Sequence, residues 1–339
     1  MSRTPTRGED PPDPGTIADG RRAYRVAYDG RRYAGFQRQP HARTVEGTLL
    51  GALADLGVVD RGSGPTHATP DGYAAAGRTD AGVSAVAQTV AFDAPNWLRP
   101  RAFNSRLPDS IRVWAAADVP NDFHATHRAV ERTYRYYLDA PRDGDGGDHH
   151  NVNGGDHRNV VEGDHRNVVE GDHRNVEETE VVDPERLRAA LSRLAGTHDF
   201  RNLTTDERGT VRTIDASATR KGRFLVIEVT ADGFPRALVR RLVAVARLVA
   251  TGRADLPFLD RVLDPDPLPG HLGVGPAEPE PLVLWDVAYE GVRFELDEQA
   301  AEAARAAFRE RRREALRTAA VSGAIRSRIG DVMADRGGE

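Results

Sequence analysis

The sequence predicts a fold that mixes β-strands with α-helices, and three features carry this prediction. Residues 83–92 alternate like a strand and are largely apolar on both faces, which is typical of a sheet covered on both sides. Residues 211–219 and 224–231 form two further strand patterns around a tight turn. Leucines at helical spacing predict amphipathic helices elsewhere. At 339 residues we expect two domains, or one elongated domain with two lobes.

The first part of the chain predicts a leader, a strand and a helix. Residues 1–20 hold four prolines among charges and glycines and few apolar side chains, which predicts a disordered leader. A strand over 23–28 ends at Asp29-Gly30, a dipeptide typical of hairpin turns. Thr44 is a candidate N-cap for a helix that Gly57 ends, and its apolar face holds Leu49, Leu50, Leu53 and Leu56.

The middle of the chain predicts a short helix, two strands and an insertion. The helix covers 96–107 and ends before Pro108, and the strands begin at Ile111 and Glu131. Over 143–178 an eight-residue unit of the form Gly-Asp-His-Arg-Asn-Val-Val-Glu occurs in four copies. Units this polar bury no core, so we interpret the segment as a disordered loop insertion. Its recurring histidines leave metal binding as the alternative.

The last part of the chain returns to helices and strands. Asp183 and Pro184 are the N-cap and first residue of a helix that Gly196 ends. The strand pair over 211–231 leads through Gly233-Phe234-Pro235 into a helix over 236–251. A final strand runs to Tyr289. Beyond it, alanine and arginine predominate and predict two helices, over 299–317 and 325–333.

Charge and composition exclude several classes of protein. The formal net charge is −5, so an RNA site has to be a local basic patch. Among the 47 lysines and arginines, Lys221 is the single lysine. The absence of cysteine excludes disulfides, thiolate metal sites and a cysteine nucleophile. No apolar run reaches the length of a membrane span, so we expect a soluble, cytoplasmic protein without membrane association.

Residues 76–83 form the candidate site. They place Arg78 and Asp80 between two glycines, Gly77 and Gly82, beside the apolar strand. Glycine permits a tight turn and the close approach of a ligand. A carboxylate among apolar strands is costly unless it is paired, which favours a functional role. The alternative is an ordinary turn in which Asp80 bonds its own backbone.

The string Gly77-Arg78-Thr79-Asp80-Ala81-Gly82-Val83 resembles the signature loop of the tRNA pseudouridine synthase A (TruA) family. Further strings resemble that family in the same order along residues 24–292: Tyr-Asp-Gly at 28–30, Gly-Phe-Gln-x-Gln at 35–39, Thr-Val-Glu at 44–46, Leu-Pro-Asp-x-Ile-x-Val at 107–113, Asp-Phe-His-Ala at 122–125, Arg-Thr-Tyr-Arg-Tyr at 132–136, His-Asp-Phe at 198–200 and Phe-x-x-x-Leu-Val-Arg at 234–240. The chain is therefore identified as a member of this family, with archaeal, haloarchaeal-like proteins as its expected relatives.

The resemblance implies an α+β pseudouridine synthase fold. Two similar halves, over 21–118 and 119–297, would join their antiparallel sheets into one, with the active cleft between them and a helical tail over 298–339. The implied reaction converts uridine to pseudouridine at positions 38–40 of the tRNA anticodon arm. Because it involves no net redox change or hydrolysis, we expect no cofactor and no metal. The expected partner is tRNA, and the expected assembly is a homodimer.

The resemblance also implies roles for individual residues. Asp80 would be the nucleophile, Arg240 its ion-pair partner, and Tyr134 the side chain against the target base. An arginine partner keeps a carboxylate ionised in an apolar cleft, as a nucleophile requires. Substrate binding is expected from Arg31, Arg32, Arg38, Arg78, Thr79 and Arg236.

Three positions depart from the family pattern. Ser84 stands in place of a usual histidine, Thr126 in place of an arginine, and Arg241 in place of an asparagine, while Arg128 is a candidate substitute for the missing arginine. Two alternatives stay open beside the main prediction. One is a pseudouridine synthase that acts on other RNA sites, and the other is a non-catalytic tRNA-binding protein.

Overall fold

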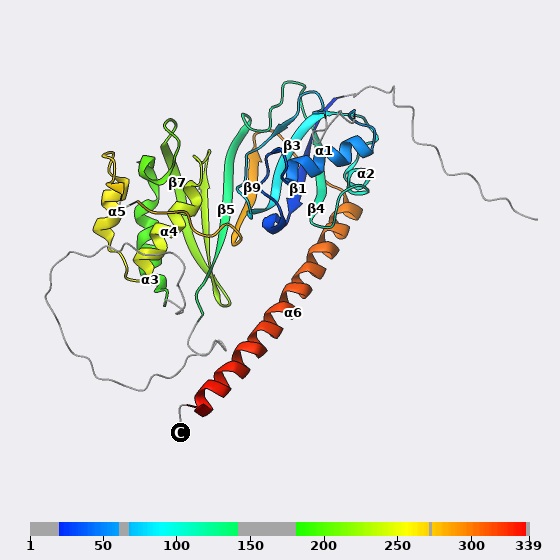
Figure 1. The fold of residues 1–339 in the computed structure, drawn as a ribbon. Coiled ribbons are helices and arrows are strands. Elements are labelled where there is room, and N and C mark those ends of the chain that lie inside the picture. Colours follow the sequence, from blue (N-terminus) through cyan, green and yellow to red (C-terminus); the bar gives the residue numbers. More distant parts are fainter. Residues whose placement is uncertain (1–19, 61–67, 142–180, 271–272, 337–339) are drawn as a thin grey trace, which may run out of the picture. The chain divides into compact units, whose positions relative to one another are not determined.

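The computed structural model describes residues 20–60, 68–141, 181–270 and 273–336 (Figure 1). The chain divides into two compact units, Met1–Val130 with Val287–Phe308 and Glu131–Asp286 with Arg309–Glu339, and each is described by itself. Of the predicted leader, only Gly20 is described, and the insertion predicted over 143–178, with its histidines, lies outside the described residues. The prediction that 21–118 and 119–297 are two halves of similar fold stays a prediction.

The sheet of the first unit is built around β1 (Gly20–Tyr28). This strand pairs antiparallel with β3 (Ser84–Ala94) on one side and with β4 (Ile111–Asp118) on the other. The strands predicted for this region are confirmed, and β3 is buried along most of its length, as predicted. Two short strands extend the sheet by antiparallel pairing, β2 (Ala74–Ala75) on β3 and β10 (Glu295–Leu296) on β4.

Aromatic and leucine side chains form the core of the first unit. The Tyr24 ring stacks on Phe92 with 5.1 Å between the ring centroids, and Phe103 meets both rings edge-on. The predicted helix is confirmed as α1 (Val45–Asp55), where the Thr44 hydroxyl accepts the N–H of Gly47. Its buried leucines are Leu49, Leu50 and Leu53.

Two predictions for the first unit are wrong. Asp29-Gly30 does not form a hairpin, because β1 pairs with β3 and β4, and the chain enters a 3-10 helix, η1 (Gly30–Arg32), where the Asp29 side chain accepts the backbone N–H of Arg31. The helix expected over 96–107 is only α2 (Pro100–Asn104), and Trp97 is 37% exposed. Proline explains the late start, since the residue before it is held in an extended conformation, as Arg99 is.

The sheet of the second unit has the order β5, β8, β7, β6, with every pairing antiparallel. The predicted hairpin is confirmed, since β7 and β8 pair antiparallel and the turn between them follows Lys221. The short strand β6, which follows the first helix of this unit, was not predicted. The bounds are β5 (Ala129–Asp139), β6 (Gly196–Asp199), β7 (Val211–Lys221), β8 (Phe224–Ala231) and β9 (Leu282–Tyr289).

Three helices pack together in the second unit (Figure 1). The predicted N-cap is confirmed in α3 (Pro184–Leu194), where Asp183 accepts the N–H groups of Glu185 and Arg186. The backbone N–H of Asp183 donates to the carbonyl of Ala250, which ties α3 to the end of α4 (Leu238–Ala250). The third helix, α5 (Leu256–Leu263), was not predicted. A second 3-10 helix, η2 (Arg201–Leu203), also contacts α4 and α5.

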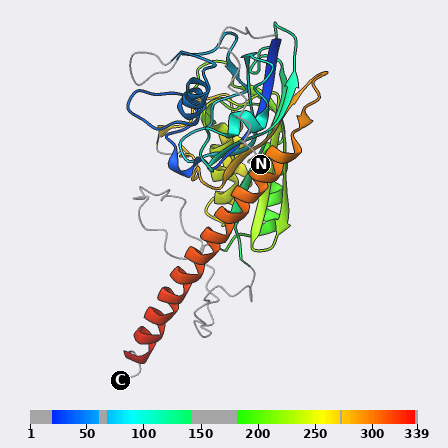
Figure 2. The same ribbon diagram turned by 90° about the vertical axis from the view of Figure 1, so that its right-hand side faces the viewer.

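The two C-terminal helices predicted from the sequence are a single helix, α6 (Glu298–Arg336), which Figure 2 shows without a break. The Asp297 carboxylate accepts the N–H of Ala300 at its start. Two interior glycines, Gly323 and Gly330, do not interrupt it, because each costs only about 1 kcal/mol against the helix-favouring alanines and arginines around it. Among the described helices, none is long and apolar enough to cross a membrane. The α+β class is confirmed.

Candidate active site

The N-terminal arm of loop 76–83 is fixed to strand β3. The Ala76 N–H donates to the Thr89 carbonyl at 2.8 Å. The side-chain amide of Gln88, which is fully buried, donates to the Gly77 carbonyl at 2.9 Å. Because both partners lie in the middle of a buried strand, the loop leaves the sheet in a defined direction.

The centre of the loop rests on two residues from other segments. The Thr79 carbonyl accepts the N–H of Phe36 at 3.0 Å, and the Thr79 hydroxyl lies 2.8 Å from the hydroxyl of Tyr28. Tyr28, Phe36 and Thr79 are all buried. The strings at 28–30 and 35–39, which the sequence analysis noted as motifs only, therefore support the residue that precedes Asp80.

The C-terminal arm of the loop is a tight turn against η1. Gly82 has a positive φ of 85°, the Val83 N–H donates to the Asp80 carbonyl at 3.1 Å, and the Gly82 N–H donates to the Tyr33 carbonyl at 3.4 Å. Gly30 packs so closely that a Cβ atom there would lie 2.0 Å from the Val83 carbonyl oxygen. The Gly30 N–H also donates to the Ser84 hydroxyl at 3.1 Å, so Ser84 binds backbone at this position.

These contacts leave the two charged side chains of the loop with different exposure to solvent. Arg78 is exposed, whereas Asp80 is half-buried at the start of the turn. A carboxylate on a loop that is fixed at both arms and at its centre has little freedom to move, which is what an attacking group needs. The geometry therefore suits a nucleophile or an electrostatic partner for a substrate.

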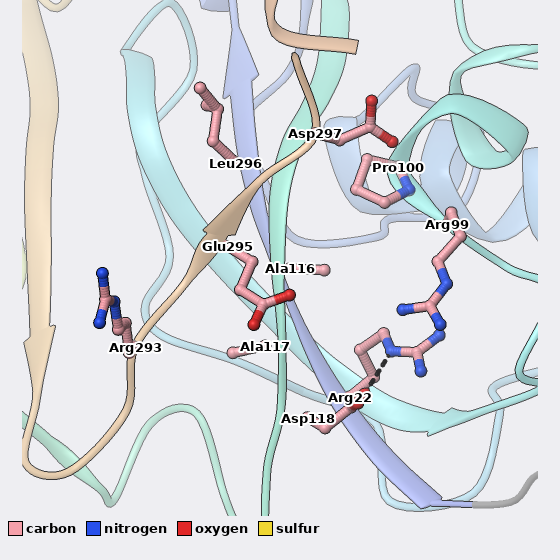
Figure 3. Close-up of a pocket in the computed structure, with 10 residues that line it drawn as sticks. All are labelled: Arg22, Arg99, Pro100, Ala116, Ala117, Asp118, Arg293, Glu295, Leu296 and Asp297. Atoms are coloured by element: carbon pink, nitrogen blue, oxygen red, sulfur yellow. Dashed lines mark hydrogen bonds and ion pairs between the residues drawn. The ribbon is translucent and has the colours of Figure 1, made fainter. Parts of the chain in front are cut away.

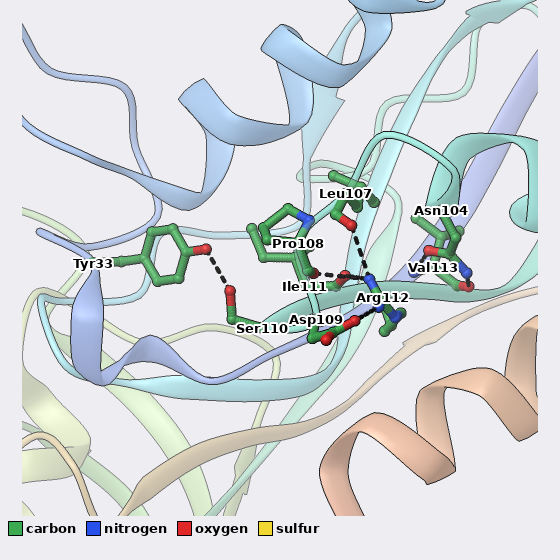
Figure 4. Close-up of polar contacts among 9 residues, drawn as sticks. All are labelled: Tyr33, Asn104, Leu107, Pro108, Asp109, Ser110, Ile111, Arg112 and Val113. Carbon is green, nitrogen blue, oxygen red and sulfur yellow. Dashed lines mark hydrogen bonds and ion pairs between the residues drawn. The ribbon is translucent and has the colours of Figure 1, made fainter. Parts of the chain in front are cut away.

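Loop 107–110 contacts the residues that flank η1, and Figure 4 shows its bond to Tyr33. The Ser110 hydroxyl lies 2.7 Å from the hydroxyl of Tyr33, and the Ser110 carbonyl accepts the N–H of Asp29 at 3.0 Å. Arg112 donates to the carbonyls of Leu107, Pro108 and Ile111 and pairs with Asp109. The arginine thus holds loop 107–110 in shape, and the loop holds η1 against residues 82–84.

Basic side chains lie on the segment that follows β1 and contacts the loop. Arg31 pairs with Asp29 through two hydrogen bonds, of 2.9 and 2.7 Å, and Arg32 is exposed. Arg38 is anchored by its backbone N–H, which donates to Glu46, and by its side chain on Thr69. Arg43 was not predicted, and its guanidinium lies over the Tyr33 ring at 4.9 Å from its centroid. Its position directly before the N-cap Thr44 is the only sequence signal for it.

The residue that replaces the family arginine also contacts the loop region. The Thr126 hydroxyl donates to the Ala75 carbonyl at 2.5 Å, next to the first residue of the loop. Arg128, the candidate substitute, pairs with Asp122. His124 stacks near His127 with ring centroids 4.2 Å apart, and burial, reinforced by His127 and Arg21, lowers the pKa of His124.

The second unit carries the other site residues. Tyr134, on β5, is half-buried and meets the Phe234 ring edge-on at 5.3 Å between centroids. Arg240, on the first turn of α4, donates from Nε to the Ala277 carbonyl at 2.6 Å and accepts the Ala277 N–H on its own carbonyl at 3.0 Å. Arg236 is exposed, with a loose ion pair to Asp206 at 3.9 Å. Burial raises the pKa of Tyr136, on the same strand as Tyr134, to about 12.

Comparison with known proteins identifies the family. Residues 190–290 match the family described as tRNA pseudouridine synthase. The chain is 55% identical to the tRNA pseudouridine synthase A of Haloarcula marismortui over 89% of this chain and 97% of that protein. It is 50% identical to that of Natronomonas pharaonis, over 90% and 98%, and 32% identical to that of Thermococcus sibiricus, over 88% and 96%. This chain belongs to the tRNA pseudouridine synthase A family. The predicted likeness to haloarchaeal members is confirmed.

The predicted site residues fall in both units. Asp80, Arg78 and Thr79 lie on one loop of the first unit, with Arg31, Arg32 and Arg38 on the segments that follow β1. Tyr134, Arg236 and Arg240 belong to the second unit. The ion pair of Asp80 with Arg240 and the place of Tyr134 relative to Asp80 join two separately described units, so both stay predictions.

One pocket of about 340 Å³ lies elsewhere in the first unit (Figure 3). Its walls come from α2, β4, β10 and the start of α6, and it includes the buried Arg22, which pairs with Asp118 at 2.6 Å. None of its lining residues belongs to loop 76–83. Within residues 20–60, 68–141, 181–270 and 273–336, no cluster of histidine and acidic side chains could hold a metal ion.

Proposed function

We propose that this protein isomerises uridine to pseudouridine in tRNA, with the carboxylate of Asp80 as nucleophile. The proposal rests on membership of the tRNA pseudouridine synthase A family together with one observation. Loop 76–83 is fixed at both arms and at its centre, and it leaves Asp80 half-buried and Arg78 exposed.

The reaction balances without any additional reagent. The bond between N1 of uracil and C1′ of ribose breaks, a bond between C5 and C1′ forms, the proton on C5 is lost and N1 gains a proton. An ionised carboxylate starts the sequence by attacking either the uracil ring or the anomeric carbon, and its release completes it. The residue needed is therefore a charged Asp80 in a site that holds the base and ribose in fixed orientation.

Arg240 and Tyr134 complete the proposed site. Arg240 pairs with Asp80 and holds the carboxylate in its charged form. Its Nε bond to the Ala277 carbonyl orients the guanidinium, because a planar group fixed at one nitrogen can rotate little. Tyr134 lies against the target base, with its ring supported by Phe234. Arg78 occupies the space that the base leaves when it is extruded from the stem, a step that costs a few kcal/mol.

Arginines of both units hold the tRNA backbone. Arg31, Arg32, Arg38 and Arg236 bind phosphates, and Arg43 joins them because it is exposed and its guanidinium is held on Tyr33. Thr79 contributes to substrate binding through its backbone, next to the nucleophile. The targets are uridines 38–40 of the anticodon arm, and the enzyme works as a homodimer in the cytoplasm, an assembly that sedimentation analysis tests.

The decisive experiment compares Asp80→Asn with the wild-type enzyme on tRNA transcripts. The substitution removes the charge and nearly preserves the shape, so folding and tRNA affinity should be unchanged while pseudouridine formation falls to a trace. Transcripts with cytidine in place of uridine at positions 38, 39 or 40 report which positions are modified. Asp71→Asn, which changes an exposed carboxylate outside the loop, is the matched control and should stay active. Pseudouridine formed by Asp80→Asn above a trace would remove Asp80 from the role.

A further inference from the structure

The residue before the proposed nucleophile is held by a buried pair of hydroxyl groups. Tyr28, the last residue of β1, is 1% exposed, and Thr79 is 6% exposed. Their hydroxyl oxygens lie 2.8 Å apart. A hydrogen bond removed from water in this way is directional and is costly to leave unmade, so it fixes the rotamer of Thr79.

The same neighbours also fix the Thr79 backbone. The Phe36 N–H donates to the Thr79 carbonyl at 3.0 Å, and the Phe36 ring packs on the Tyr28 ring with 6.2 Å between centroids. The side chain and the carbonyl of Thr79 are therefore held by two residues that contact each other. Since Thr79 and Asp80 share a peptide bond, the backbone of Asp80 has little freedom on its N-terminal side.

We propose that Tyr28 and Thr79 are positioning residues for the isomerisation, and that their hydrogen bond sets the place of the Asp80 carboxylate. The inference rests on the proposed function, in which Asp80 attacks the substrate. Neither hydroxyl touches the substrate in this proposal, because both side chains are buried. A displacement of the attacking group by about 1 Å is enough to cost about 100-fold in rate.

The chain offers a matched control on the same strand. Tyr24 is also a fully buried tyrosine of β1, and its hydroxyl donates to the Leu98 carbonyl at 2.9 Å. This hydrogen bond does not involve loop 76–83. Tyr24→Phe therefore removes a buried hydroxyl of the same kind without changing the support of Asp80, and it separates positioning from a general loss of stability.

The experiment measures single-turnover rate and tRNA affinity separately. Tyr28→Phe and Thr79→Val should each lower the rate about 10- to 100-fold, while the Kd for tRNA changes less than about twofold. Thr79→Ser keeps the hydroxyl and should retain most of the rate. The double variant should be no slower than the slower single variant, because both changes remove the same bond. Tyr24→Phe should lose thermal stability and keep the wild-type rate.

The outcomes distinguish this inference from the proposed function. A wild-type rate for Tyr28→Phe overturns the positioning role, and so does a loss that appears only in Kd, which would mean that Thr79 contacts RNA. If Thr79→Val does not fold, Tyr28→Phe and Thr79→Ser decide the question by themselves. Activity in Asp80→Asn, measured in parallel, would instead remove the proposed function, whatever the Tyr28 result.

Discussion

Two segments carry the proposed catalytic residues, and the chain holds them by different means. Loop 76–83 is held largely through its backbone, by bonds to β3, Phe36 and Tyr33 and by the close packing of Gly30. Segment 233–240 is held at Arg236 by side chains of its neighbours. The Thr204 hydroxyl donates to the Arg236 carbonyl at 3.0 Å, and the Asp206 carboxylate accepts the Arg236 N–H at 2.8 Å.

The difference determines which substitutions each segment tolerates. Against the first, Gly30 has to be a glycine because the backbone of Val83 occupies the place of its side chain. In the second, Ala237 stands in the left-handed region, with φ 56° and ψ 10°, directly before α4. An L-residue there is strained, so the segment carries a cost that the loop avoids. Replacing Gly30 with alanine should therefore destabilise the protein, whereas replacing Ala237 with glycine should stabilise it.

The largest effect is expected at the point where the two segments are proposed to act together. Arg240→Met keeps much of the side-chain volume and removes the charge that we propose pairs with Asp80, so the rate should fall by orders of magnitude, with a modest loss of stability. Single-turnover assays on tRNA and thermal unfolding measure the two effects. Arg253→Met, an exposed arginine beyond the end of α4, is the control. Near-normal rates for Arg240→Met would mean that Asp80 has a different partner.

Much of this arrangement could be predicted from the sequence. The caps Thr44 and Asp183 and the buried strand after loop 76–83 follow from local patterns, because side-chain type alone determines capping and alternation. The family resemblance supplied Asp80, Tyr134 and Arg240, which no periodicity distinguishes from ordinary turn, strand and helix residues.

The remaining features depend on contacts between distant residues. Asp29-Gly30 looks like a hairpin turn, but the backbone at Val83 and the hydroxyl of Ser84 occupy its far side. Arg43 is separated from Tyr33 by ten positions, so its stacking has no local signal. The support of Thr79 by Tyr28 spans 51 positions. Such contacts arise only when strands and loops meet in the folded chain.

The next effect tests the backbone-held loop. Gly30→Ala would place a Cβ atom 2.0 Å from the Val83 carbonyl oxygen, so the turn after Asp80 has to move. We expect a rate loss of about 100-fold and a destabilisation of about 1–3 kcal/mol. Gly20→Ala, at the first residue of β1, is the control. Its added Cβ atom meets no atom within 4 Å, so this variant should behave like the wild type. A Gly30→Ala enzyme with full activity would show that the loop tolerates displacement.

A smaller effect, of opposite sign, is expected in segment 233–240. Ala237→Gly removes the Cβ atom from a left-handed residue and should raise the free energy of unfolding by about 0.5–1 kcal/mol, after the added freedom of the unfolded chain is counted. Denaturant unfolding measures it. Ala244→Gly, inside α4, should lower the same quantity by about 1 kcal/mol. Equal losses from both substitutions would contradict the strain at Ala237.

The smallest effect concerns the bond of Thr126 to Ala75, the residue before the loop, at a site beside His124. The His124 ring accepts the Thr126 N–H at 3.3 Å, and its pKa is lowered in the folded protein, first by burial. The folded state therefore binds a proton less readily than the unfolded chain, so stability should be full above the unfolded pKa of about 6.5 and should fall as the pH drops below it. His124→Asn removes this titration, and its loss of Tm between pH 7 and pH 5 should be smaller than that of the wild type. His41→Asn, an exposed histidine in the same unit, is the control and should follow the wild-type curve. Parallel curves for His124→Asn and the wild type would show that protonation of His124 does not weaken this support.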